Sequence, residues 1–276
     1  MKKPRLLRDI ITIGVIVLIY LLIRGDGGLH DSSISIPLGL KAVFVIIMAV
    51  LLCYSLGRRV KKLLRLGQQV KHEHIPTSEA DHPWLDSQSL SRWTAELEAL
   101  GFVRLNDFTV HYLTEGVSNL QFFTRLMLHP VERCIASSIN MFVPSANRFT
   151  SQEGITSCFE DGWDISTTRS KPNWVAYLIN MPKENWSSHP NAAPKELFEI
   201  HLKQCRRFSS DMGLRNVTGA TAEEYFAWQK KLEDPRREML KKRPALVFFI
   251  NWIMFLAFHP AKGGSAYAAA LKKMRK

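Results

Sequence analysis

The chain lacks the short motifs that mark several large enzyme classes. Its 276 residues contain no GxxxxGKS/T loop and no GxGxxG loop after a strand-like segment, so the usual sequence support for ATPases, kinases and nicotinamide-dependent enzymes is missing. HExxH and GxSxG are also absent, which removes the same support for zinc proteases and α/β-hydrolases. There are only four cysteines, and no two of them form a CxxC pair. We therefore expect no cofactor, and the sequence by itself indicates no specific activity.

Acidic residues are scarce at both ends of the chain. The formal net charge is +12, but residues 1–71 carry +9, residues 72–234 carry −6 and residues 235–276 carry +9. A protein that binds DNA or RNA through its folded domain is expected to carry its positive charge on that domain, facing the phosphates. Here the positive charge flanks apolar runs instead. We therefore expect a lipid bilayer as the partner, and no nucleic acid.

Two apolar runs near the N-terminus predict a transmembrane helical hairpin over residues 1–57. Residues 10–23 contain no charge, and residues 36–57 are interrupted by a single ionisable residue, Lys41. A helix needs about 20 mostly apolar residues to cross a bilayer. No small-residue cleavage site follows the first run, so we interpret it as a retained span and not as a secretory signal peptide.

Basic residues beside these runs predict the orientation of the hairpin, because Lys and Arg concentrate in the short cytoplasmic segments of membrane proteins. Four basic residues precede the first run, whereas the connecting segment has one Arg and two Asp. After the second run come Arg58, Arg59, Lys61, Lys62 and Arg65. We expect a multi-pass protein of the inner (plasma) membrane with both termini in the cytoplasm. These five residues either contact anionic lipid as well or act only as topology determinants.

A third apolar run, residues 245–258, follows Lys241, Lys242 and Arg243. As a helix it would extend about 21 Å, which is less than a hydrocarbon core of about 30 Å. We therefore expect residues 244–276 to form an apolar membrane-interface helix and a basic tail, with Trp252 at the level of the headgroups. A re-entrant segment and a buried helix of the soluble domain remain alternatives.

Between these regions, residues 58–88 are expected to form a basic juxtamembrane helix and a polar linker, and residues 89–243 a cytoplasmic domain. Apolar residues recur at helical spacing over 89–100. Short segments rich in β-branched and aromatic residues follow, separated by turn residues, and the last of them covers 173–180. They predict a mostly antiparallel sheet of five or six strands. With helices before and after the sheet, the fold class is α+β.

Turn and capping residues locate several element ends. Gly101 can adopt the left-handed conformation that ends the first helix. Asp161-Gly162 is a strong signal for a tight hairpin turn, because both positions tolerate a positive φ. After a loop over residues 182–193 helices return, and Thr221 with Glu224 predicts a capping box at the start of the last of them.

Two groups of residues are candidates for chemistry. His201 and Cys205 are four positions apart and therefore adjacent on a helix, so the imidazole could activate the thiol, with Cys134 as a further candidate. Both helix residues lie on its apolar face, so small buried side chains are the alternative interpretation. His72, His74 and His82 could hold a metal ion such as Zn²⁺ together with nearby carboxylates, or could belong to a hydrated linker.

The charge distribution favours a membrane-anchored protein whose cytoplasmic domain binds, scaffolds or regulates, acting on lipid or on another membrane protein. The alternative is a membrane-associated enzyme that acts on a lipid or membrane-derived substrate and uses the Cys/His pair.

Overall fold

The computed structural model describes most of the second of two compact units into which the chain divides, Met1–Ser55 and Leu56–Lys276. The predicted transmembrane hairpin lies outside the described residues apart from its last four positions, 54–57, which are helical. Among the helices of the described part, none is both long enough and apolar enough to cross a membrane. The described residues are 54–62, 72–112, 120–171, 177–178, 183–258, 267 and 270–272.

The second unit is built on a seven-stranded sheet whose strands are neighbours in the order of the sequence. Each pair of neighbours among the first six strands is antiparallel, and β7 is parallel to β6. This confirms the α+β class and the mostly antiparallel sheet, but the predicted number of five or six strands was too low. The strands are β1 (His72–Pro76), β2 (Val103–Tyr112), β3 (Gln121–His129), β4 (Cys134–Val143), β5 (Arg148–Phe159), β6 (Trp163–Thr168) and β7 (Glu184–Ser188).

The two edge strands lie where the sequence predicts no strand. β1 falls in the predicted polar linker and β7 in the predicted loop over 182–193, whereas Tyr177 and Leu178 of the predicted strand 173–180 are helical. Both edge strands are short and mainly polar, so neither has the alternation of apolar and polar residues that marks a half-buried strand. They form because a neighbouring strand offers backbone hydrogen bonds, as in the five-residue register between β6 and β7.

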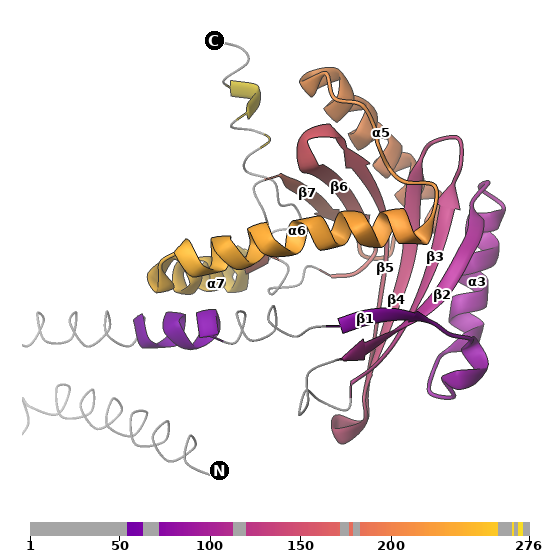
Figure 1. Ribbon diagram of the computed structural model, residues 1–276, viewed down its shortest axis with the longest axis horizontal. Coiled ribbons are helices and arrows are strands. Elements are labelled where there is room, and N and C mark those ends of the chain that lie inside the picture. The colour runs from indigo at the N-terminus through magenta and orange to yellow at the C-terminus, as the bar shows by residue number, and fades with distance from the viewer. Residues whose placement is uncertain are drawn as a thin grey trace, which may run out of the picture. The chain divides into compact units, whose positions relative to one another are not determined.

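Helices cover both faces of the sheet (Figure 1). α3 (Ser87–Glu98) and α5 (Pro194–Met212) pack on one face, which we call the α3/α5 face. The first turns of α6 (Ala222–Lys242) pack on the other, the α6 face, against apolar residues of β2, β3 and β4. Because β3 lies between the two helix layers, its last seven residues are buried on both faces. α7 (Ala245–Phe258) packs against the end of α6 and against residues 60, 177 and 178.

The predicted turn residues adopt the expected conformations. Gly101 has a φ of 95°, just after the end of α3. Asp161 and Gly162 have φ values of 58° and 76° and join β5 to β6. The Thr221 side chain accepts a hydrogen bond of 3.2 Å from the backbone N–H of Glu224, which confirms the cap of α6. The Glu224 carboxylate accepts from the backbone N–H of Ala220 and not from that of Thr221, so the box is displaced by one residue.

A buried ionic cluster ties β2, β3 and α3 together on the α3/α5 face. The Arg125 side chain is 2% exposed and donates to both oxygens of Asp107, at 2.9 and 2.8 Å. It also donates to the Thr94 hydroxyl at 3.0 Å and pairs with Glu79. Asp107 has a second partner in Arg104, whose side chain is 46% exposed. Each of the three nitrogens of the Arg125 guanidinium thus has a partner inside the protein.

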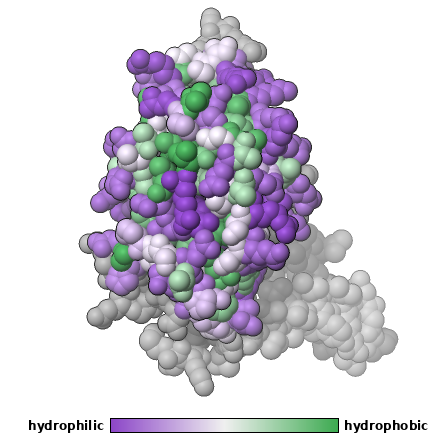
Figure 2. Space-filling model, turned by 90° about the vertical axis from the view of Figure 1, so that its right-hand side faces the viewer, coloured by the Kyte–Doolittle hydropathy of each residue, from purple (hydrophilic) through white to green (hydrophobic). Residues whose placement is uncertain are grey.

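The side of the molecule on which α3 lies carries no single continuous apolar area among the described residues in view. Figure 2 shows hydrophobic residues there in small groups that hydrophilic residues separate. Scattered apolar side chains of this kind are normal for a protein surface.

Candidate functional site

The predicted catalytic pair is assembled, but it is enclosed beneath α5. His201 is fully buried, and its two ring nitrogens lie 2.9 Å from the Ser157 hydroxyl and 3.0 Å from the Thr167 hydroxyl. The Cys205 Sγ is 3.4 Å from Nε2 of His201. Cys134, on β4, is also fully buried and belongs to the core between the sheet and α3 and α5.

The protonation states of these groups do not favour a nucleophile. Burial lowers the pKa of His201 to about 3, so the imidazole is neutral at physiological pH. Burial also raises the pKa of Cys205 to about 12 and raises that of Cys134. A reactive cysteine needs an accessible thiolate. The described geometry instead gives His201 a structural role, bridging two hydroxyl groups of β5 and β6.

We predict that the cysteines of the second unit are protected from thiol reagents in the native state. In a fragment of residues 56–276, the buried thiols Cys134, Cys158 and Cys205 should react at least about 100-fold more slowly than an exposed thiol introduced by Ser91→Cys on α3, because labelling requires local opening. Mass spectrometry of peptides from native and denatured samples measures this. Rapid native labelling of Cys205 would contradict the enclosed arrangement and restore it as a nucleophile.

Of the three histidines proposed as metal ligands, His74 and His82 make separate contacts in the part that the structure describes. The His74 ring stacks on Phe226 of α6, with ring centroids 3.9 Å apart. His82 is buried, and its Nε2 lies 3.0 Å from the Thr77 hydroxyl. His72 begins β1. Among the described residues, no group of three or more His, Cys, Asp or Glu side chains could hold a metal ion.

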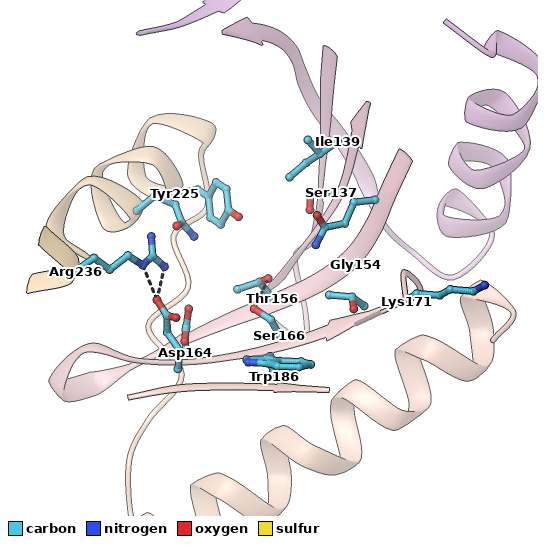
Figure 3. Close-up of a pocket in the computed structure, with 14 residues that line it drawn as sticks. Ser137, Ile139, Gly154, Thr156, Asp164, Ser166, Lys171, Trp186, Tyr225 and Arg236 are labelled. Carbon is cyan, nitrogen blue, oxygen red and sulfur yellow. Dashed lines mark hydrogen bonds and ion pairs between the residues drawn. The ribbon is translucent and has the colours of Figure 1, made fainter. Parts of the chain in front are cut away.

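A polar groove lies on the α6 face, between α6 and strands β4 to β7 (Figure 3). Its cavity volume is about 280 Å³. Side chains from β4, β5, β6 and β7 form its floor, and α6 forms a wall with Tyr225, Gln229 and Arg236. It arises because the floor carries small hydroxyl side chains, among them Ser137, Ser166 and Thr168, where the neighbouring strands carry large apolar ones.

One end of the groove contains two carboxyl groups and one guanidinium group. Asp164 and Glu184 are register partners on the parallel strands β6 and β7, so their side chains lie on the same face. Arg236 of α6 binds Glu184, with Nε 2.9 Å from Oε1, as the dashed lines in Figure 3 mark. Asp164 is 6% exposed, and burial, together with the Glu184 charge, raises its pKa to about 8. Asp164 therefore holds a proton at neutral pH.

The predicted membrane-facing basic residues fall into two groups. Lys61 and Arg243 point inward: the Lys61 ammonium donates to the carbonyl oxygens of Lys241, at 2.9 Å, and Arg243. Lys61 thus supplies a positive charge at the C-terminus of α6, where the helix dipole favours one. The Arg243 guanidinium donates to the Leu178 carbonyl at 2.8 Å and lies over the Phe248 ring. The exposed residues are Arg58, Arg59, Lys62, Lys241 and Lys242, and Arg65 lies outside the described residues.

α7 is apolar apart from Asn251, and its buried side chains, among those that the structure describes, lie on one side of the helix. Phe248 and Phe255 are buried, and Trp252 is half-buried beside them. The opposite face exposes large apolar side chains at helical spacing, Leu246, Val247, Ile250 and Met254. We call these four residues the α7 stripe.

The sequence does not predict the groove. Alternating polar residues in β6, Asp164, Ser166 and Thr168, are a signal that one face of this strand contacts something other than an apolar core. The same alternation also fits a solvent-exposed strand face, so only the position of α6 distinguishes the two. Comparisons with protein-family models, with curated proteins and with solved structures found no match to this chain.

Proposed function

We propose that this chain is a membrane-anchored protein whose α+β domain is a cytoplasmic binding module with a scaffold or regulatory role. The observation that carries the proposal is the α7 stripe, which exposes four large apolar side chains on a helix bordered by the exposed basic residues Lys241 and Lys242. A contiguous apolar face on a helix with flanking positive charge is typical of a helix that lies in the interface of an anionic bilayer.

The sequence around the stripe supports the same partner. Residues 56–62 pack in the same unit as α7 and expose Arg59 and Lys62. They directly follow the apolar run 36–57, which we propose as the second span of an N-terminal hairpin. The positive charge beside both spans favours an orientation with both termini in the cytoplasm, at the inner membrane. Another membrane protein that contacts the same surface remains compatible with this arrangement.

A binding role is favoured over catalysis by the contrast between the two polar sites. The groove on the α6 face is open and is lined mainly by polar side chains. The Cys/His pair is enclosed, with a protonated thiol and a neutral imidazole. A domain with an accessible groove and no exposed nucleophile is suited to recognition.

We predict that the second unit binds anionic membranes through the α7 stripe. A fragment of residues 56–276 should float with vesicles of phosphatidylcholine and phosphatidylglycerol at low salt, and less at high salt, because its exposed lysines and arginines contribute about 1 kcal/mol each near an anionic surface. Ile250→Asp should weaken this partition by at least about tenfold, because it removes exposed apolar area that the bilayer would bury and adds a negative charge.

The matched control is Val131→Asp in the turn between β3 and β4, where the valine is 82% exposed and lies outside the α7 stripe. It should leave the partition unchanged. A fragment that stays in solution with anionic vesicles at low salt, or two variants with equal effects, would contradict membrane docking by α7.

A further inference from the structure

The groove is a gap in the packing on the α6 face. In the first turns of α6, Tyr225 and Phe226 pack against Leu126, Leu128 and Ile135 of the sheet. Farther along the helix, the strands below it carry hydroxyl side chains instead, and a cavity of about 280 Å³ remains. Some polar groups of the groove bond to one another, as the Thr156 and Ser166 hydroxyl groups do at 3.0 Å. Water or a polar ligand in the cavity can bond the donors and acceptors that remain.

The charges in the groove compensate one another near neutral pH. Arg236 is neutralised by Glu184, which it binds directly. Asp164 lies beside this pair and holds a proton, since burial raises the pKa of its carboxyl group to about 8. The remaining charge, Lys171, is exposed at the rim and points away from the other labelled side chains (Figure 3). The charged groups inside the groove are therefore paired with each other, and a ligand with a net charge would have to compete with that pair.

The hydrogen-bonding groups of the groove can both donate and accept. Ser137, Ser166 and Thr168 carry hydroxyl groups, each of which can donate one hydrogen bond and accept two. The side-chain amides of Gln152 and Gln229 combine a donor with an acceptor. A protonated Asp164 carboxyl group does the same. The matching ligand therefore offers several groups that both donate and accept, which is the property of hydroxyl groups.

Trp186 supplies an aromatic face to the groove. Its indole N–H is buried, so the ring face and not the donor is available to a ligand. In Figure 3 the ring is seen nearly edge-on below Ser166, so that one ring face is turned toward the groove. A flat apolar ring face beside a set of hydroxyl, amide and carboxyl groups fits a ligand that has both C–H faces and hydroxyl edges.

We propose that this groove binds an uncharged polyhydroxylated ring, that is, a sugar or a cyclitol. The cavity is slightly smaller than the range of about 300–1,000 Å³ typical of drug-sized ligands, which fits one ring. The ring is either a free sugar or the head group of a lipid. A lipid head group would lie close to a domain that is anchored in the membrane. This inference names the ligand class for the binding role proposed above, and it does not depend on the α7 stripe.

Saturation-transfer difference NMR on the full chain, in micelles of a detergent without a sugar head group, tests the proposal. The probes are glucose, galactose, N-acetylglucosamine and myo-inositol, with ethanolamine as a cationic and acetate as an anionic comparison. Transfer to at least one of the four neutral rings is expected. Transfer to none of them, or stronger transfer to ethanolamine or acetate, would overturn the proposal.

Two variants fill the groove from different strands. Ser137→Leu and Ser166→Leu place a branched side chain in the floor and should abolish the transfer, whereas Ser91→Leu on the exposed face of α3 should leave it unchanged. Far-UV circular dichroism and cooperative thermal unfolding show whether each variant folds. One folded groove variant is enough to test whether the sugar binds in the groove. Transfer that persists in a folded groove variant would show that the sugar binds elsewhere and would overturn the assignment.

Vesicles that contain a glucosyl or inositol lipid separate the two sources. Displacement of the bound free ring by these vesicles assigns a lipid head group, and transfer that withstands them assigns a free sugar; both support the ligand class. Vesicle flotation of the Ile250→Asp variant is independent of the groove, so the membrane proposal and the sugar proposal can fail separately.

Discussion

Asp164→Asn is expected to stabilise the domain at neutral and alkaline pH. The folded pKa of Asp164 is about 8, against an ordinary value of 3.8, so the folded state binds more protons than the unfolded state between these two values. Stability therefore falls as the pH rises through this window, by up to about 1.4 kcal/mol per pH unit. Asn has nearly the shape of the protonated acid and does not titrate. The expected gain is about 2–4 kcal/mol at pH 7, near zero at pH 4 and largest at pH 8 and above.

Urea unfolding of residues 56–276 at several pH values measures this gain. The groups that face Asp164 are Glu184, Arg236, Tyr225 and Cys158, and all are retained in the variant. His201 contributes the opposite slope below about pH 6.5, because its folded pKa is lowered. Since both proteins contain His201, its contribution cancels in the difference.

The matched control is Asp234→Asn on α6, where the side chain is 86% exposed. It should change stability by less than about 0.5 kcal/mol at every pH. A wild type that is as stable as Asp164→Asn at pH 8 would show that Asp164 is ionised and solvated in the folded state. The interior of the groove would then carry a net negative charge at that pH. A gain in stability for Asp164→Asn would mean that the wild-type acid lowers the stability of the domain. Residues with such a cost are common in binding sites.

Arg125→Met should destabilise the domain by about 3 kcal/mol, because it leaves the buried carboxylate of Asp107 without its main partner. The remaining ion pair of Asp107 with Arg104 holds the effect near the lower end of the range for broken buried pairs. Urea unfolding of the same fragment gives the difference in the free energy of unfolding.

Two variants separate lost charge pairing from lost packing. Arg125→Met combined with Asp107→Leu removes both members of the pair, and it should regain most of the loss, since apolar replacements of whole buried ion pairs are often neutral. Arg206→Met removes an Arg whose side chain is 72% exposed and whose ion pair spans 3.5 Å, so it should cost less than about 0.5 kcal/mol. If the double variant is as unstable as Arg125→Met alone, the cluster acts through packing and not through charge.

The sequence by itself determined the elements that local physics specifies. Residues 197, 201, 205 and 208 recur at helical spacing, and all four are buried on α5. Asp161-Gly162 and Gly101 are predictable because few residues tolerate a positive φ. The separation of charge into two basic ends and an acidic middle is likewise a property of composition alone, and the membrane proposal begins from it.

Only the tertiary structure decided which polar residues share a site. β1 and β7 have no hydrophobic alternation, so they become strands only because β2 and β6 offer them backbone partners. Arg236 reaches Glu184 across 52 positions of sequence, and the groove exists because α6 crosses above the hydroxyl-rich part of the sheet. Lys61 and Lys62 are neighbours in the sequence, yet one binds the carbonyl end of α6 and the other is exposed. Periodicity and turn signals report on a few neighbouring residues, whereas burial and pairing depend on contacts between distant segments, and these contacts create the site.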